Sequence, residues 1–311
     1  MTAPMIIICG ATASGKTDLA VRIANHLKTE IISADSAQVY RGLDKGTAKP
    51  TVEERALAPH RMIDVVAPTD AFSVGDYRDQ ARAEAKNLWE NGKIPVICGG
   101  TGFYIKSLLY DFSYGGASGN AEIRKKYELI LNSHGKDALF DVLKQKDPQS
   151  ATVLHPNDVM RVIRALEIYD VTGKPKSAQN DDENAIRPYL AYCLEWDRAE
   201  LYDRINCRVD KMLESGLVEE VRGLLDSGVD ENAQSMQAIG YKEVVAYLKG
   251  AYDYGTMSDV IKQNTRNYAK RQLTFFKKLK GLQFLQAKHG IEENVKTVLQ
   301  DLERQQWTSN N

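Results

Sequence analysis

Hydrophobic and polar positions follow two different periods along the first hundred residues. The run MIIIC at residues 5–9 is apolar throughout, as in a buried strand, and DLAVRIANHL at residues 18–27 repeats its apolar positions at helical spacing. EIISADS and IPVICGGTG predict two further strands. Between them, FSVGDYRDQARAEAKNLWENG predicts a helix capped by Ser73 with Asp76 and stopped at Gly92. Alternating strands and helices indicate a doubly wound parallel sheet, which binds ligands at the carboxyl ends of its strands.

The loop between the first strand and the first helix reads GATASGKT, with the spacing G-x-x-x-x-G-K-[ST]. In a strand–loop–helix context, the backbone amides and helix N-terminus of such a P-loop bind phosphate oxygens. The lysine adds a positive charge, and the last hydroxyl can ligate Mg²⁺. We predict a phosphate site, with Thr17 as metal ligand, formed by Gly10, Ala11, Thr12, Ala13, Ser14, Gly15, Lys16 and Thr17.

The pattern changes after Phe112, where YGGASGN reads as a linker. Charged helical sequence without strand alternation continues to about Gly173, and the polar segment SAQNDDENAIRP precedes the strand-like run YLAYCLEW. We expect an α/β fold: a P-loop NTPase-like doubly wound parallel sheet with an inserted all-helical domain. The core would comprise residues 1–113 and 187–311 with C-terminal helices, and the insertion residues 114–186.

A helix capped by Asp197 with Glu200 should follow the strand YLAYCLEW. Its buried stripe at helical spacing is predicted to be Leu201, Ile205, Val209 and Met212. Arg204 and Arg208, four residues apart, share a neighbouring face of this helix.

Composition indicates an ordinary globular protein, with 43% hydrophobic and 27% charged residues and a net charge of −1. No apolar run approaches the roughly 20 residues needed to cross a bilayer, and the chain enters its first strand without a basic leader. We expect a cytosolic protein that does not contact membranes and, since no exposed apolar seam is evident, a monomer. The cysteines are expected to be small buried hydrophobic residues: Cys9, Cys98, Cys193 and Cys207.

One segment departs from the balanced charge. Residues 260–291 contain no Asp or Glu but carry Lys262, Arg266, Lys270, Arg271, Lys277, Lys278, Lys280 and Lys288. Such a segment is either a footprint for a polyanion, here an RNA backbone, or a solvated helix face. Its larger side chains are expected to be core residues rather than stacking platforms: Tyr268, Phe275, Phe276 and Leu279.

Most P-loop hydrolases need a carboxylate at the end of a second core strand. Here IPVICGG ends in Gly99, Gly100 and Thr101, and an acid is available only at Asp35, after the second strand. Asp35 is either a base for an acceptor group or a turn residue. A P-loop metabolite kinase would use the same cradle and base, and a non-catalytic RNA-binding ATPase is a third hypothesis, which the missing acid after Cys98 disfavours.

The run ISADSAQVYRGLDKGTAKP, residues 32–50, closely resembles a signature of the tRNA dimethylallyltransferases, the bacterial tRNA A-isopentenyltransferase family. GGTGFYIKSLL, NDVMRVIRALEIYDVTGKP, RINCRVDKMLESGLVEEV and QAIGYKE match further blocks in the same order. The resemblance covers nearly the whole chain. We expect the bacterial form, because no zinc-finger extension follows.

The resemblance implies that the P-loop holds the diphosphate of dimethylallyl diphosphate as a leaving group, so that nothing is phosphorylated. The dimethylallyl group would pass to N6 of the adenosine immediately 3′ of the anticodon, in tRNAs that read codons beginning with U. Asp35 would be the general base, and Thr101 would donate to the bridging oxygen. An adenylate isopentenyltransferase would share this chemistry, but the insertion and the QAIGYKE block favour tRNA.

Stabilisation of the departing diphosphate is assigned, by the same resemblance, to Lys16, the loop amides, Mg²⁺ near Thr17 and an arginine. Arg204 matches the arginine at the start of the R-I-x-x-R helix and is preferred, with Arg208 second. A surface ion pair would explain either arginine equally well.

The resemblance also implies a grip on the anticodon stem-loop of tRNA, with the acceptor base flipped out of its loop. The expected contacts are Asp35, Ser36, Ala37, Gln38, Thr101, Arg124, Met160, Arg161, Val162, Ile163, Arg164, Gln237, Ala238, Ile239, Gly240, Tyr241 and Lys242. Two positions depart from the family pattern. Ala37 stands where many relatives have Arg, which removes a contact to the RNA or to the loop. His60 is followed by Arg61 where a His pair is common.

Overall fold

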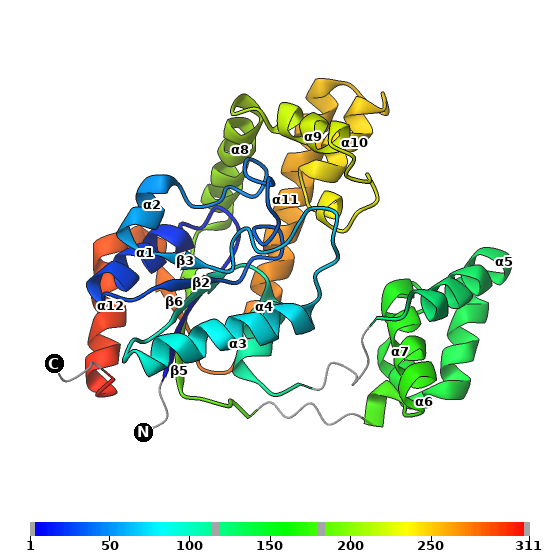
Figure 1. Ribbon diagram of the computed structural model, residues 1–311, viewed down its shortest axis with the longest axis horizontal. Helices are drawn as coiled ribbons and strands as arrows, with labels where there is room; N and C mark the ends of the chain where they lie inside the picture. The colour runs from blue at the N-terminus through cyan, green and yellow to red at the C-terminus, as the bar shows by residue number, and fades with distance from the viewer. Residues whose placement is uncertain (1–3, 113–118, 179–183, 308–311) are drawn as a thin grey trace. The chain divides into compact units, whose positions relative to one another are not determined.

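The computed structural model describes residues 4–112, 119–178 and 184–307. The chain divides into two compact units, a core unit of residues 1–109 and 186–311 and a helical unit, Tyr110–Ala185 (Figure 1). These limits lie within four residues of the expected insertion at 114–186. Most of the predicted linker YGGASGN, and part of the polar segment SAQNDDENAIRP, lie outside the described residues.

The core unit is built on a six-stranded sheet with the order β3-β2-β4-β1-β5-β6 in the described residues. All pairings are parallel, and β1 lies between β4 and β5. The predicted doubly wound α/β fold is therefore confirmed. The strands are β1 Met5–Cys9, β2 Ile31–Ser33, β3 His60–Arg61, β4 Val96–Gly99, β5 Tyr189–Glu195 and β6 Leu282–Gln286.

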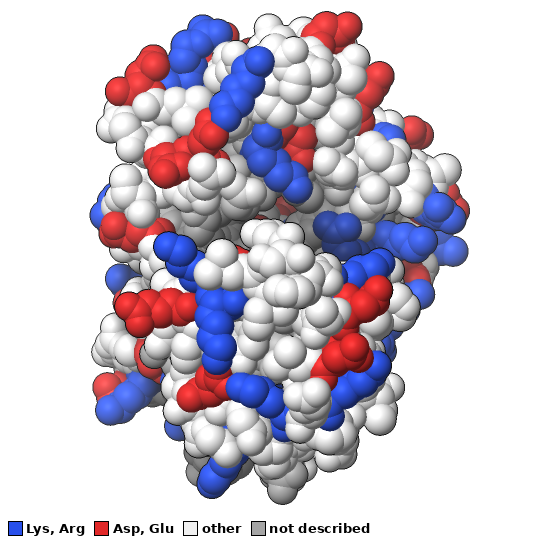
Figure 2. All heavy atoms as spheres, turned by 90° about the vertical axis from the view of Figure 1, so that its right-hand side faces the viewer, with Lys and Arg blue, Asp and Glu red and all other residues white. Residues whose placement is uncertain are grey.

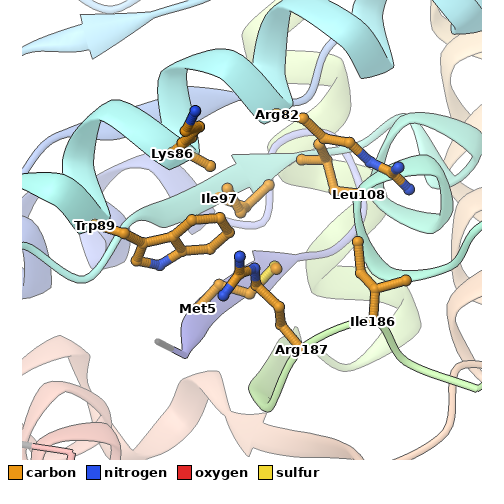
Figure 3. Close-up of a pocket in the computed structure, with 9 residues that line it drawn as sticks. Met5, Arg82, Lys86, Trp89, Ile97, Leu108, Ile186 and Arg187 are labelled. Atoms are coloured by element: carbon orange, nitrogen blue, oxygen red, sulfur yellow. The ribbon is translucent and has the colours of Figure 1, made fainter. Parts of the chain in front are cut away.

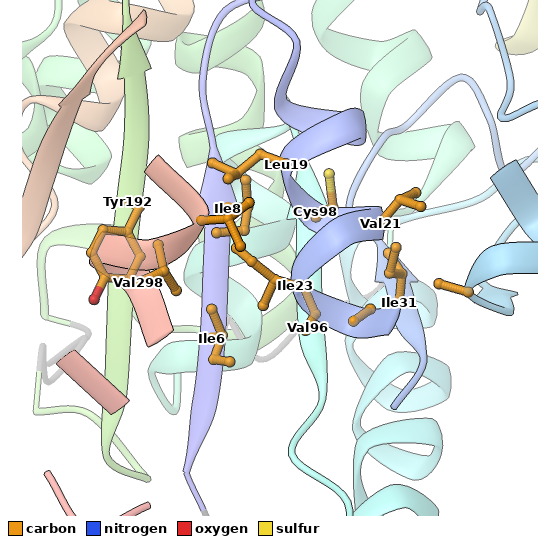
Figure 4. Close-up of a cluster of buried hydrophobic side chains, with 14 of the residues drawn as sticks. Ile6, Ile8, Leu19, Val21, Ile23, Ile31, Val96, Cys98, Tyr192 and Val298 are labelled. Atoms are coloured by element: carbon orange, nitrogen blue, oxygen red, sulfur yellow. The ribbon is translucent and has the colours of Figure 1, made fainter. Parts of the chain in front are cut away.

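Helices cover both faces of this sheet (Figure 1). They are α1 Lys16–His26, α2 Val52–Leu57, α3 Val74–Glu90, α4 Gly102–Leu109, α8 Arg198–Glu214, α9 Leu217–Asp226, α10 Tyr241–Leu248, α11 Tyr254–Phe276 and α12 Ile291–Arg304, with 3₁₀ turns η2 Ser235–Gln237 and η3 Ala287–His289. On one face, α1 and α12 bury Leu19, Ile23 and Val298 against Ile6 and Ile8 (Figure 4).

On the other face of the sheet, α3 and α4 pack together. Tyr77 of α3 stacks on Tyr104 of α4 with ring centroids 3.8 Å apart. The Tyr77 hydroxyl donates to the Ser33 carbonyl at 3.0 Å, which ties this layer to β2. The predicted capping box of α3 is confirmed, since the Ser73 side chain accepts from the Asp76 amide and Asp76 returns the bond.

The helical unit buries its own apolar side chains. It consists of α5 Ala121–Lys146, α6 Pro148–Val153, α7 Val159–Thr172 and the 3₁₀ turn η1 Lys176–Ala178. Gly135, at φ 80°, interrupts α5, so this span is two helices joined by a kink. Tyr127, Leu139 and Leu143 of α5 pack with Leu166 of α7. The described residues of this unit contain no strand of the sheet, as expected from the absence of strand alternation.

Several details differ from the sequence predictions. β3 and β6 were not predicted, because β3 is two residues long and β6 is a half-exposed edge strand without a continuous apolar pattern. On α8 the fourth buried side chain is Leu213 and not Met212, because Met212 faces a cavity described below. Cys9, Cys98 and Cys193 are buried as predicted, whereas Cys207 is exposed. Within the three described ranges, no helix is long and apolar enough to cross a membrane.

Candidate active site

The P-loop follows β1 and leads directly into α1. Gly10 and Gly15 adopt positive φ angles of 147° and 88°, which favour glycine because it lacks a Cβ. The N-terminus of α1 has no side-chain cap, so its first amides remain available to an anion. The buried Ser14 hydroxyl has no hydrogen-bond partner among the described residues. A cradle with an unpartnered hydroxyl and uncapped amides fits a phosphate group.

Two cations extend into the cavity beside this loop. Lys16 Nζ donates to the Ala11 carbonyl at 3.3 Å, and an Nη of Arg208 donates to the Thr47 carbonyl at 3.2 Å. The Arg208 Nε is buried without a hydrogen-bond partner among the described residues. Burial lowers the pKa of Lys16 and the pKa of Arg208 below their ordinary values. Both side chains are therefore electrostatically suited to an anionic ligand.

Asp35 and Thr101 meet at the carboxyl ends of β2 and β4, as the sheet edge predicts. Asp35 Oδ1 accepts from the amides of Ala37 at 2.9 Å and Gln38 at 3.4 Å. Its other carboxylate oxygen has no hydrogen bond among the described residues. Thr101 Oγ1 accepts from the Ser36 amide at 2.9 Å, so the two loops hold each other. Asp35 is thus both the turn residue and a carboxylate with one oxygen available for proton transfer.

The end of β4 has no room for the carboxylate that P-loop hydrolases place there. A Cβ on Gly99 would stand 2.1 Å from the Ala34 carbonyl oxygen, a distance that no side chain can adopt. The chain cannot carry an acid at this position without moving the loop after β2. This close approach explains why the chain carries no acid directly after Cys98, while Asp35 stands at the end of the neighbouring strand β2.

The cavity at the P-loop, here named the P-loop cavity, has walls that include Thr12, Lys16, Thr17, Asp35, Arg208 and Tyr268. An adjoining cavity shares four of these residues, namely Thr12, Asp35, Arg208 and Tyr268. Its other walls include Ser36, Ala37, Met212, Gln237, Ile239 and Lys242. A charged cavity therefore opens next to a larger, more apolar one, and Asp35 is among the residues that line both.

Two residues of α11 that the sequence analysis did not assign to the site also line it. Tyr268, expected in the core, is half-buried and lines both cavities, and burial raises the pKa of its phenol to about 12. Gln272 bonds to the P-loop backbone. Phe276 and Leu279 are buried as expected. The helical spacing of Tyr268 and Gln272 was visible, but nothing in the sequence placed α11 over the P-loop.

Arg204 is exposed beside the P-loop, with an Nη 3.8 Å from where a Cβ on Gly15 would stand, and lines neither cavity. Its Nε donates to the Ala13 carbonyl at 2.8 Å, and its guanidinium stacks 4.2 Å above the Trp196 ring. Trp196 Nε1 in turn donates to the Ser14 carbonyl at 2.8 Å. Ala13 has a positive φ of 62°, which is unfavourable for a non-glycine residue. In this structure Arg204 supports the strained loop, while Arg208 faces the cavity.

Four of the six QAIGYK residues line the adjoining cavity, namely Gln237, Ala238, Ile239 and Lys242. The other two are structural here. Gly240 begins α10 at a φ of 97°. The Tyr241 ring is buried, and its hydroxyl donates to Glu220 at 2.6 Å.

The predicted RNA contacts of the helical unit fall into two groups. Met160 and Arg161 are exposed on α7, whereas Val162 and Ile163 are buried in the core of the unit. Two arginines are held by one carboxylate, that of Glu167, whose side chain is 0% exposed. Arg124 Nε lies 2.9 Å from Glu167 Oε1, and an Nη of Arg164 lies 2.7 Å from Oε2.

The basic segment 260–291 is partly neutralised. Lys262 forms a 2.6 Å ion pair with Asp210, and Arg266 donates to Asn206 at 2.6 Å. Arg271 lines the adjoining cavity. Cationic and anionic side chains are interspersed on the face that Figure 2 shows, in keeping with the net charge of −1. In this segment Lys262 and Arg266 therefore bind side chains of α8, whereas Arg271 faces the adjoining cavity.

The two departures from the family pattern are also placed. Ala37 lines the adjoining cavity, so the missing arginine leaves space there. Arg61 pairs with Glu30 at 2.7 Å, away from the P-loop. His60 lines the P-loop cavity, and its Nδ1 lies 2.8 Å from the Ala58 carbonyl oxygen.

A further cavity lies at the amino end of β1, around Met5, Leu108 and Ile186 (Figure 3). Arg187 stacks 4.1 Å above the Trp89 ring at this cavity. It shares no lining residue with the P-loop cavity. Parallel sheets bind ligands at the carboxyl ends of their strands, so the P-loop cavity is the better active-site candidate.

Comparison with known proteins agrees with this geometry. The IPP transferase family model matches residues 38–279, and the isopentenyl transferase model matches residues 3–62. The tRNA dimethylallyltransferase of Alkaliphilus oremlandii is 42% identical over 301 residues, covering 96% of both chains. That of Thermoanaerobacter sp. is 45% identical over 282 residues, covering 89% of this chain and 90% of the relative.

Solved structures give the same result. The full-length tRNA isopentenylpyrophosphate transferase of Bacillus halodurans superposes with a TM-score of 0.73 at 39% identity, covering 98% of both chains. A eukaryotic dimethylallyltransferase, solved in snapshots of its action on tRNA, superposes with a TM-score of 0.77 at 29% identity, covering 92% of this chain and 74% of that one. The chain belongs to the tRNA dimethylallyltransferase family, an enzyme family of prenyltransferases.

Proposed function

We propose that the protein transfers the dimethylallyl group of dimethylallyl diphosphate to N6 of the adenosine immediately 3′ of the anticodon, in tRNAs that read codons beginning with U. The observation that carries this proposal is the pairing of two cavities at Asp35. The P-loop cavity offers amides and cations to a diphosphate, and the adjoining cavity offers space for the acceptor base. Membership of the tRNA dimethylallyltransferase family supports dimethylallyl diphosphate as the donor and tRNA as the acceptor.

The leaving group is stabilised by groups that are already in place. The P-loop amides, the Ser14 hydroxyl and Lys16 surround the position of the diphosphate. Arg208 is the arginine that we assign to it in preference to Arg204, because Arg208 lines both cavities and Arg204 lines neither. Thr101 lines neither cavity, but its Oγ1 accepts from the amide of Ser36, the residue after Asp35, and donates to Ser36 Oγ at 3.2 Å. We assign its hydroxyl to the bridging oxygen, for which it would exchange the bond to Ser36 Oγ.

The transfer balances as a displacement at carbon. The N6 lone pair attacks C1 of the dimethylallyl group, the C1–O bond breaks, and diphosphate leaves with the bonding pair. Asp35 takes the proton that N6 loses, through the carboxylate oxygen that the turn amides do not use. The amides of Ala37 and Gln38 donate to the other oxygen of Asp35, which fixes the orientation of this carboxylate.

The residues present also fit Mg²⁺. Thr17 and Asp35 line the P-loop cavity, and Mg²⁺ commonly takes one or two protein oxygens together with substrate phosphates and waters. The described residues contain no group of three or more His, Cys, Asp or Glu side chains that could hold a metal without substrate. When bound, the ion would neutralise charge on the departing diphosphate. Thr17 would hold it through its hydroxyl.

RNA contact by the core is proposed for Ser36, Gln237 and Lys242, which line the adjoining cavity beside Asp35. In the helical unit we propose Met160 and Arg161, because both side chains are exposed. Arg124 and Arg164 keep exposed fractions of 45% and 29% while paired with Glu167, so a phosphate can approach both side chains.

Product identity tests the proposal. The protein is incubated with dimethylallyl diphosphate, Mg²⁺ and an anticodon stem-loop, and the RNA is digested to nucleosides and analysed by mass spectrometry. We expect N6-dimethylallyladenosine from the stem-loop with adenosine 3′ of the anticodon, and none when guanosine replaces it. Modification of a different nucleoside, or of free AMP in preference to RNA, would overturn the proposed acceptor.

A further inference from the structure

Gln272 of α11 joins two loops of the active site. Its Oε1 accepts from the Thr12 amide of the P-loop at 2.9 Å, and its Nε2 donates to the Gly100 carbonyl after β4 at 2.9 Å. The side chain is buried. One amide group thus uses its acceptor on one loop and a donor on the other, a role that requires both ends of a glutamine.

Helix α11 packs directly on the backbone of the second loop. A Cβ on Gly100 would stand 2.2 Å from Gln272 Nε2, and a Cβ on Gly102 would stand 2.2 Å from the Phe275 ring. Thr101 lies between these two glycines. In the GGTG sequence, Gly100 and Gly102 therefore match the close approach of α11, which holds the backbone on both sides of Thr101.

We propose that Gln272 is a positioning residue for prenyl transfer, which holds the diphosphate cradle at a fixed distance from the loop that carries Thr101. This inference rests on the proposed function. Leaving-group departure needs the P-loop, Thr101 and Asp35 in one geometry, and a shift of about 1 Å between such groups can cost on the order of a hundredfold in rate. Gln272 acts through the backbone of both loops.

The test compares Gln272→Met with Gln263→Met. Methionine has a similar length but makes neither hydrogen bond, and Gln263 is exposed on the same helix. For Gln272→Met we expect kcat to fall about 30-fold to 100-fold, with KM for the RNA stem-loop within about twofold of wild type. Gln263→Met should behave as wild type. Wild-type kcat in Gln272→Met would overturn the proposal.

Amide hydrogen exchange separates positioning from general stability. In Gln272→Met the Thr12 amide loses its acceptor, so a peptide covering residues 10–17 should exchange faster while a peptide from β5 keeps its wild-type rate. Equal acceleration in both peptides would show that Gln272 only stabilises the core, and would refute a specific positioning role.

Gln272→Glu is the variant to measure if Gln272→Met does not fold. The carboxylate can still accept from Thr12, but it cannot donate to Gly100 and adds a negative charge near the diphosphate. We expect residues 10–17 to stay protected from amide hydrogen exchange and kcat to fall. The affinity for inorganic diphosphate, measured by calorimetry, should also fall. Unchanged kcat would contradict the proposal. Absence of transfer by the wild-type protein would instead refute the proposed function.

Discussion

Two regions of the molecule hold pairs of cations: the P-loop cavity, with Lys16 and Arg208, and the Glu167 cluster, which we define as Glu167, Arg124 and Arg164. The cations have different partners in the two regions. In the helical unit, Arg124 and Arg164 converge on one fully buried carboxylate. In the P-loop cavity, the hydrogen bonds of Lys16 and Arg208 go to main-chain carbonyls, and no carboxylate among the described residues lies within ion-pair distance of either side chain.

This difference separates a structural cluster from a binding site. Removing a cation from water is costly unless a counter-ion and hydrogen bonds compensate for the lost hydration. The Glu167 cluster contains its own counter-ion. In the P-loop cavity, Asp35 lines the wall but forms no ion pair with Lys16 or Arg208, and burial lowers the pKa of both cations. A bound diphosphate would supply the missing negative charge. The buried cations therefore lower the stability of the unliganded protein and raise its affinity for the anion.

Asp35 is the one carboxylate among the described residues that line the P-loop cavity, and its substitution should have the greatest effect on activity. If Asp35 is the general base, Asp35→Asn preserves the turn but removes the proton acceptor, and kcat should fall about a thousandfold. KM for dimethylallyl diphosphate should stay within a factor of about three, because no ion pair to Lys16 or Arg208 is lost. Steady-state kinetics check this. A large rise in KM with unchanged kcat would make Asp35 a counter-ion instead.

The second effect distinguishes the two arginines of α8. Arg208→Met should raise KM for dimethylallyl diphosphate about a hundredfold, because it removes a desolvated cation from the cavity. Arg204→Met should raise it less than about tenfold, since only the support of the Ala13 carbonyl is lost. Titration with inorganic diphosphate gives the same comparison without turnover. A larger rise in KM for Arg204→Met than for Arg208→Met would show that Arg204 is the arginine that binds the diphosphate.

A third prediction concerns stability in the helical unit. Glu167→Gln leaves Arg124 and Arg164 without their shared carboxylate, but both arginines are partly exposed, so we expect a loss of about 2 kcal/mol in the free energy of unfolding. Affinity for inorganic diphosphate should not change. Denaturant unfolding and calorimetry measure the two quantities. Weaker diphosphate binding would contradict the separation of the two regions.

The smallest effect is a pH dependence at Lys16, whose pKa burial lowers from its usual 10.5. As pH rises through the lowered pKa, the unliganded cavity loses charge, and affinity for inorganic diphosphate should fall about tenfold relative to Lys16→Arg. In Lys16→Arg the side chain stays charged, so any change of affinity with pH in this variant comes from titration of the diphosphate itself.

Stability of the unliganded protein should move the opposite way. Between the lowered pKa and 10.5 the unfolded chain binds more protons at Lys16, so the free energy of unfolding rises with pH across that window. The rise should be absent in Lys16→Arg. Identical pH profiles for wild type and Lys16→Arg, in binding and in unfolding, would exclude the lowered pKa.

Local patterns in the sequence predicted the P-loop, four of the strands and the capping box of α3, because each depends on neighbouring residues. Gln272 and Thr12 could not be paired in this way, since their hydrogen bond spans 260 positions. The sequence preferred Arg204 to Arg208 as the arginine at the diphosphate, and this preference stays a prediction. Both lie on one helix, and only the packing of α8 against the P-loop shows which guanidinium enters the cavity.

We infer that the P-loop binds a leaving diphosphate and not ATP for phosphoryl transfer. The most direct measurement follows transfer of radiolabel from dimethylallyl diphosphate to an anticodon stem-loop, with diphosphate release and ATP cleavage assayed in parallel. We expect one diphosphate released per labelled RNA, no ATP cleavage, and loss of both RNA labelling and diphosphate release in Asp35→Asn. ATP cleavage that depends on the RNA, without label in the RNA, would contradict it.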